Sequence, residues 1–153
     1  DYAINARVNN SDTNTFLTNG GGTNTTDNRI TIQGISHGSS NTILVGQKAL
    51  RISKHTADNA ADWDESIVQG GWGGTGRRGN KSTSNDQAGV DSYILVRENV
   101  ANSPTHNAVF GGPFPSGVLF VMGDGSVRNV TYSVTGRNLC LLLNARDGQV
   151  TNE

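Results

Sequence analysis

The segment GVLFVMGDGSVRNVTY, residues 117–132, decides the fold expected for this 153-residue chain. Residues 118–122 form an apolar run that is typical of a buried strand, and residues 127–132 alternate apolar and polar side chains. The Asp124-Gly125 pair between them is a strong hairpin signal, because a two-residue turn needs positive φ at both central positions. We therefore predict a β-hairpin over residues 118–132.

The flanking sequence adds two short helices and further strands to this hairpin. Leucines recur at helical spacing within residues 136–146, and Gly148 follows as a stop signal. Short alternating or aliphatic runs predict strands at 29–33, 41–48 and 91–98, and residues 53–69 are expected to form a short helix. Gly46 inside the second of these strands suggests a bulge or a close backbone approach. The sequence predicts a single α+β domain over residues 1–153, dominated by antiparallel strands and long Gly/Asn/Thr-rich loops.

Composition excludes several classes of partner. The net charge is −1 and only 16% of residues are charged, so the chain offers no strong field to nucleic acid or to an anionic membrane. No apolar run approaches the roughly 20 residues of a membrane span. We expect no nucleic-acid partner and no membrane span within these residues.

No constellation of side chains points to catalysis or to a cofactor. Cys140 is the single cysteine, which excludes an intramolecular disulfide, and its leucine-rich surroundings favour a small buried hydrophobe. The histidines, at positions 37, 55 and 106, lack zinc-ligand spacing and are expected to be exposed or locally hydrogen-bonded. The acidic segment 58–69 does not follow a calcium-loop pattern, and the glycine-rich segment 70–79 lacks the order of a phosphate-binding loop. We expect a non-enzymatic protein without a metal or cofactor.

Polar and aromatic loop residues favour two kinds of contact with sugars. Four Asn-x-Ser/Thr sequons are candidate glycosylation sites, and three of them lie in predicted loops: Asn9, Asn24, Asn80 and Asn129. Trp63 and Trp72 are candidates for sugar stacking, and further aromatic faces are offered by Tyr2, Tyr93 and Tyr132. A cell-surface module that binds or captures carbohydrate is therefore an alternative function.

Four segments together resemble one known family. They are DYAINA (residues 1–6), ISHGSSNTILVGQKA (35–49), FGGPFPSG (110–117) followed by DGSVR (124–128), and ARDGQV (145–150). Their order and spacing are similar to those of the prepilin-like His-x9-Asp-Gly family, which is abundant in planctomycete genomes and resembles type IV pilins and type II secretion pseudopilins. The resemblance implies structural roles for Gly38, Asn41, Thr42, Gly46, Phe110, Gly111, Pro115, Gly117, Asp124 and Gly125.

The chain departs from the family pattern at three positions. The family's histidine falls on Phe114, its aspartate on His37 and its glutamate on Gln47. If the family uses these groups for a metal or for catalysis, this chain has lost them. The long apolar helix of a prepilin-type N-terminus is also absent from the 153 residues, so assembly through such a helix would need a segment upstream of residue 1.

The resemblance implies a pilin-like globular domain in an exported protein. Combined with low charge and polar loops, it predicts a structural subunit of an extracellular filament or pilus-like appendage at the cell surface, glycosylated at sequons and self-associating into a homopolymer. The alternatives are the carbohydrate-capture module and a pseudopilin-like component of a secretion or uptake system.

Overall fold

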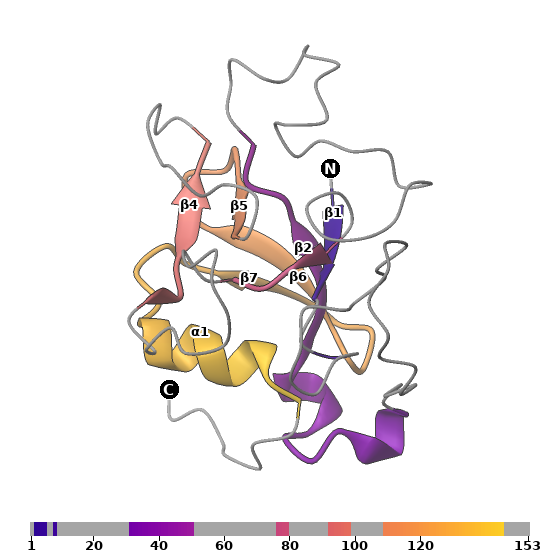
Figure 1. Cartoon of the computed structure of the whole chain (residues 1–153). Coiled ribbons are helices and arrows are strands. Elements are labelled where there is room, and N and C mark those ends of the chain that lie inside the picture. The colour runs from indigo at the N-terminus through magenta and orange to yellow at the C-terminus, as the bar shows by residue number, and fades with distance from the viewer. Residues whose placement is uncertain are drawn as a thin grey trace, which may run out of the picture.

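A computed structural model describes residues 2–5, 8, 31–50, 76–79, 92–98 and 109–145 (Figure 1). Five strands form one sheet in the order β3-β1-β2-β6-β7, namely β1 (Tyr2–Asn5), β2 (Ile43–Gln47), β3 (Gly76–Arg77), β6 (Val118–Met122) and β7 (Val127–Val130). The pairings are antiparallel except for the parallel pair β1 and β3. A second, parallel pair joins β4 (Leu95–Arg97) to β5 (Phe110–Gly112). Together with one helix, α1 (Gly136–Leu143), these strands confirm a sheet-dominated α+β fold.

The predicted hairpin is confirmed, but its turn differs from the expected two-residue form. The Gly125 amide donates to the Met122 carbonyl at 3.0 Å, and the Met122 amide donates to the Ser126 carbonyl at 2.9 Å. The turn therefore spans three residues, and Gly125, with φ 84°, takes the left-handed position at its end. Asp124 stabilises this form because its Oδ1 accepts from the Ser126 amide at 2.9 Å.

The flanking strand predictions had different outcomes. β2 confirms the strand expected over 41–48, and β4 confirms the one expected over 91–98 at Leu95–Arg97. The strand expected over 29–33 is wrong where the structure describes it, because two 3₁₀ turns, η1 (Ile32–Gly34) and η2 (Ser39–Asn41), precede β2. In η1 the Gly34 amide donates to the Thr31 carbonyl at 2.8 Å, so the backbone forms a local turn here and not an extended strand. The helix expected over 53–69 lies outside the described residues.

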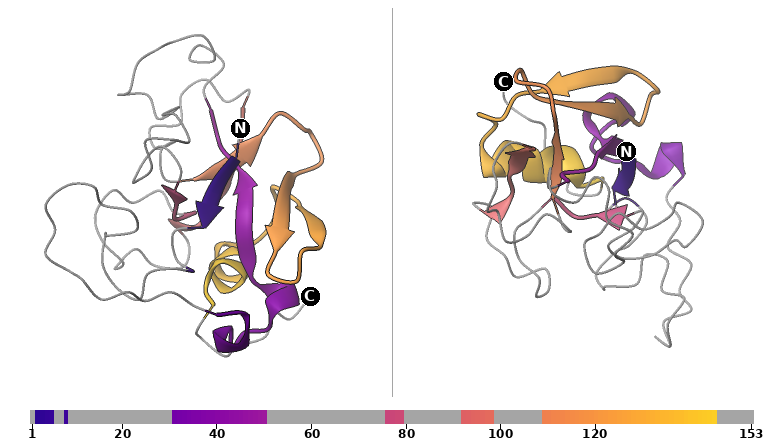
Figure 2. Two further views of the ribbon diagram at one scale, coloured as in Figure 1. Left: turned by 90° about the vertical axis from the view of Figure 1, so that its right-hand side faces the viewer. Right: turned by 90° about the horizontal axis from the view of Figure 1, so that it is seen from above.

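Helix α1 packs on one face of the hairpin and closes the core (Figure 2). The Thr135 side chain caps its first turn by accepting from the Asn138 amide at 3.3 Å. The helix ends at Leu143, three residues before the expected end at residue 146. Cys140 is half-buried at the margin of the core, which corrects the expectation of a buried thiol. The buried side chains shared by helix and sheet include Ile43, Phe110, Val118, Phe120, Met122, Val130, Leu139, Leu142 and Leu143.

Candidate functional site

The two longest family-like segments meet in space. The Gly123 amide donates to the Thr42 carbonyl at 2.8 Å, and the Thr42 hydroxyl donates to the Gly38 carbonyl at 3.1 Å. Arg128 extends across the sheet to the Ser40 carbonyl at 3.3 Å. These contacts join the start of β2 to the β6–β7 turn, so the matching motifs hold the sheet together at this end.

Gly46 confirms the expected close approach. The rings of Phe110 and Phe120 lie edge to face, 5.3 Å apart at an interplanar angle of 73°. A β-carbon at Gly46 would overlap the Phe120 ring and lie 2.8 Å from Cδ1 of Phe110. A change of register between Ile43 and Val45 in the pairing with β6 also provides the irregularity that this glycine suggested. The glycine is thus required by packing of the aromatic pair.

The other motif residues also lie in packing or turn positions. Gly38, with φ 92°, precedes η2, and Asn41 ends that turn. A β-carbon at Gly111 would overlap the Val96 carbonyl, and one at Gly117 would overlap the Val130 carbonyl. Pro115, by contrast, is exposed in the loop before β6. Nine of the ten motif residues are accounted for by backbone shape, hydrogen bonding or close packing.

The sheet face opposite α1 carries an apolar row that crosses four strands. Ile4 pairs with Val45, Val45 with Val121, and Val121 with Val127. Directly opposed residues of antiparallel strands project to the same face. Because the core-facing residues of β6 are Val118, Phe120 and Met122, the alternate residue Val121 and its partners project to the other face.

This outer row (Ile4, Val45, Val121 and Val127) is accessible to a partner. Val127 is 66% exposed and Ile4 is 37% exposed, while Val45 and Val121 are half-buried. Sequence reasoning did not identify the row. The apolar run of residues 118–122 does not show which of its side chains face away from the core, and placing Val45 in the row needs the change of register in β2.

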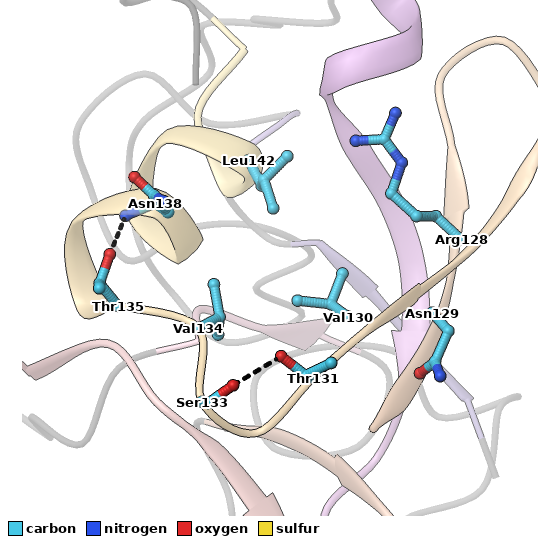
Figure 3. Close-up of a pocket in the computed structure, with 9 residues that line it drawn as sticks. All are labelled: Arg128, Asn129, Val130, Thr131, Ser133, Val134, Thr135, Asn138 and Leu142. Carbon is cyan, nitrogen blue, oxygen red and sulfur yellow. Dashed lines mark hydrogen bonds between the residues drawn. The ribbon is translucent and has the colours of Figure 1, made fainter. Parts of the chain in front are cut away.

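A groove of about 340 Å³ runs beside β7, which ends the sheet. Its apolar lining comes from Val130, Val134 and Leu142, which Figure 3 shows between the strand and α1. Its polar lining consists of Arg128, Asn129, Thr131, Ser133, Thr135 and Asn138. Within the described ranges, no strand pairs with the outer edge of β7.

Comparison with protein families gives one match. Residues 2–137 match the family described as "Protein of unknown function (DUF1559)". The chain belongs to the DUF1559 family. Comparisons with curated proteins and with solved structures gave no match.

The structure describes all three positions at which this DUF1559 protein departs from the expected motif pattern. Gln47 is buried, and its Oε1 accepts from the Leu119 amide at 3.1 Å. A neutral amide avoids the cost of a buried carboxylate at this position. His37 is buried at 4% exposure, whereas Phe114 is 47% exposed. Burial of His37 excludes exposure, which is one of the two alternatives expected for the histidines, and the other two histidines lie outside the described residues. Among the side chains that the structure describes, no three His, Cys, Asp or Glu residues are grouped as metal ligands would be.

The candidate sugar-contact residues of this DUF1559 protein are only partly described. Asn129 is exposed on β7, where its Nδ2 donates to the Ser116 hydroxyl at 3.4 Å, so this sequon lies on a strand. Tyr2 is 59% exposed, but Tyr93 is 4% exposed and its ring is not available for stacking. Outside the described residues lie Asn9, Asn24, Asn80, Trp63 and Trp72. In the described part of the chain no helix is long and apolar enough to cross a bilayer.

Proposed function

We propose that this DUF1559 protein is a structural subunit of an extracellular filament or pilus-like surface appendage that assembles from copies of itself. The observation that carries the proposal is the outer row, a partly exposed apolar line across the sheet face that α1 does not cover. Exposed apolar surface aligned on one face favours burial against a partner, at about 25 cal/mol per Å² of apolar area.

Charge supports self-association. The net charge is −1, so copies of the chain repel each other only weakly at neutral pH. The outer row itself contains no charged side chain. A face of this kind can therefore pack against another surface of a neighbouring copy without leaving a buried, unpaired charge in the row.

The sequence resemblance supports the location and the kind of assembly. The segments described above resemble the prepilin-like His-x9-Asp-Gly family, whose exported members resemble pilins and pseudopilins. Membership of this prepilin-like family and an extracellular location are therefore parts of the proposal. The motif residues would serve the assembly indirectly, by holding rigid the sheet that presents the outer row.

Glycosylation is a separate part of the proposal. Asn129 projects to the same face as Val127, where a glycan would obstruct the outer row, so the proposal places glycans at the other sequons, Asn9, Asn24 and Asn80. We expect the intact mass of the native subunit to fall on enzymatic deglycosylation. A mass that does not change on deglycosylation, in a subunit that still forms filaments, would remove glycans from the proposal without removing assembly.

A matched pair of variants tests the assembly face. Ile4→Lys places a charge in the outer row, and Ile32→Lys makes the same change at η1, outside the sheet, where the side chain is 66% exposed. Each variant replaces the native chain in the cells that make it, and filaments are counted by negative-stain electron microscopy. We expect at least a tenfold loss of filaments for Ile4→Lys and native numbers for Ile32→Lys. Equal numbers for both variants, at equal amounts of folded subunit, would contradict the proposal.

A further inference from the structure

The outer edge of β7 presents backbone groups for pairing. Met122 and Ser126 form a hydrogen-bonded pair, with the Met122 amide donating at 2.9 Å. Hydrogen-bonded and non-bonded pairs alternate along an antiparallel ladder, so Phe120 and Arg128 form the next hydrogen-bonded pair. The amides and carbonyls of Val127 and Asn129 therefore point away from β6.

This side of β7 is open. The groove lined by Arg128, Asn129, Val130 and Thr131 runs beside it, and Val127 and Asn129 are exposed. The other edge of the sheet differs, because both residues of β3, Gly76 and Arg77, are buried. In the portion of the chain that the structure describes, β7 is thus the accessible sheet edge.

We propose that β7 pairs antiparallel with β7 of a second copy of this chain, about a twofold axis at Arg128. An edge strand adds most readily to another strand of matched pattern, and a twofold pairing uses the same surface on both copies. In this register Val127 of each copy lies opposite Asn129 of the other. The pairing forms about four backbone hydrogen bonds, because all the outward amides and carbonyls of these residues find partners. The inference does not depend on filament formation.

Neighbouring registers are less favourable. An axis at Val127 would place Asn129 opposite Gly125, whose φ of 84° belongs to the turn and not to an extended strand. An axis at Asn129 would place Val127 opposite Thr131. The chain already turns at Thr131, whose carbonyl accepts from the Val134 amide at 3.1 Å. The axis at Arg128 keeps both hydrogen-bonded pairs, Val127 with Asn129 and Asn129 with Val127, within β7.

The charge of Arg128 permits this register. Two arginines opposite each other would repel if both guanidinium groups lay at the shared edge. The Arg128 Nη2 instead donates to the Ser40 carbonyl at 3.3 Å, on the η2 side of the sheet. Figure 3 shows the side chain directed toward the segment that carries η2. Each guanidinium group is therefore directed back toward its own η2, away from the shared edge.

Cysteine cross-linking tests the register. In a Cys140→Ala background, Val127→Cys and Asn129→Cys are made as separate proteins, one of them with a size tag. Opposed residues of a hydrogen-bonded pair have Cα atoms about 5.5 Å apart, within the range of a disulfide. We expect mild oxidation to link the mixture into a mixed covalent dimer and to leave each protein alone largely unlinked. A mixture that stays unlinked, or equal linking in all three samples, would overturn the proposal.

Sedimentation measures the association itself. We expect the native chain to show concentration-dependent dimerisation, and Asn129→Pro, which removes an outward amide from each copy, to weaken it at least tenfold. Thermal unfolding of the variant checks that its hairpin is intact. A native chain that sediments as a monomer at every concentration would overturn the inference. Dimers without native filaments would leave it standing and contradict the proposed function instead.

Discussion

The side chain of Asn5, on β1, donates a 2.7 Å hydrogen bond to the backbone carbonyl of Leu143, the last residue of α1. The same Nδ2 donates to the Ile43 carbonyl on β2 at 2.8 Å. The residue is fully buried, and one of the two carbonyls belongs to a helix C-terminus, which has no intrahelical donor. One amide therefore links the start of the chain to the sheet and to the helix.

Replacing this amide should destabilise the whole domain. Asn5→Ala leaves two buried carbonyls without this donor, and we expect the free energy of unfolding to fall by roughly 2–4 kcal/mol. Denaturant unfolding measures the change. Asn129→Ala is the control, because its exposed amide makes a single 3.4 Å contact, and we expect a change below about 0.5 kcal/mol. Similar stabilities for Asn5→Ala and the native chain would show that the bridge contributes little.

Substitutions at two glycines should destabilise the protein for different reasons, steric crowding at Gly46 and backbone conformation at Gly125. Gly46→Ala should lower the free energy of unfolding by about 1–3 kcal/mol, because the added methyl overlaps the Phe120 ring. Gly125→Ala should cost about 1–2 kcal/mol for a different reason, since its positive φ disfavours a β-carbon although the space around it is open. Gly125→Asn should recover part of that loss, because asparagine tolerates this conformation. A neutral Gly46→Ala would contradict the packing assigned to the aromatic pair.

Tyr132 predicts a dependence on alkaline pH. Its hydroxyl donates to the Gly112 carbonyl at 2.8 Å, and burial raises the pKa of the phenol. The folded state therefore holds this proton more tightly than the unfolded state, so the stability it contributes is present below about pH 10 and is lost as pH rises through the folded pKa. We expect Tyr132→Phe to be about 1 kcal/mol less stable at neutral pH. Chemical denaturation from pH 7 to 11 should show that the difference in unfolding free energy between the native chain and Tyr132→Phe narrows above pH 10. A difference that stays constant would contradict this role of Tyr132.

Asp124 predicts the opposite dependence, at acidic pH. The Ser126 hydroxyl donates to its Oδ1 at 2.7 Å, and with the Ser126 amide it lowers the pKa of the carboxyl. The contribution of this carboxylate is present above the ordinary pKa near about 4 and is lost as pH falls through the lower folded pKa. Asp124→Asn should therefore melt below the native protein at pH 6, and the two melting temperatures should converge below pH 4. A difference that persists at pH 2 would mean that the charge is not responsible.

Local patterns in the sequence predict the hairpin, β2 and α1, because each segment shows an apolar run or an apolar period of its own. The turn at Asp124 has three residues where two were expected. The Asp124 carboxylate accepts hydrogen bonds from Ser126, and the Asp-Gly pair that predicts the turn does not indicate these bonds. The apolar alternation ending at Ile32 predicts a strand, but alternation cannot tell whether a neighbouring strand exists to pair with it. Ile32 remains exposed and the chain forms η1.

The candidate assembly surface is harder to predict than the fold. A glycine inside the predicted strand indicates a bulge or a close approach at Gly46, and the structure shows the close approach. The outer row depends instead on which residues stand opposite each other across four strands. The change of register between Ile43 and Val45 turns Val45 away from the core, and no local period reports such a change. The role of Asn5 was missed because its partners are distant in sequence.

Negative-stain electron microscopy of the native surface material, with a gold-labelled antibody raised against this chain, tests the proposed assembly most directly. We expect the label to follow filaments along their length, since every subunit is a copy of this chain. Label confined to single particles, in material whose other filaments remain unlabelled, would contradict the proposal that this protein is a filament subunit.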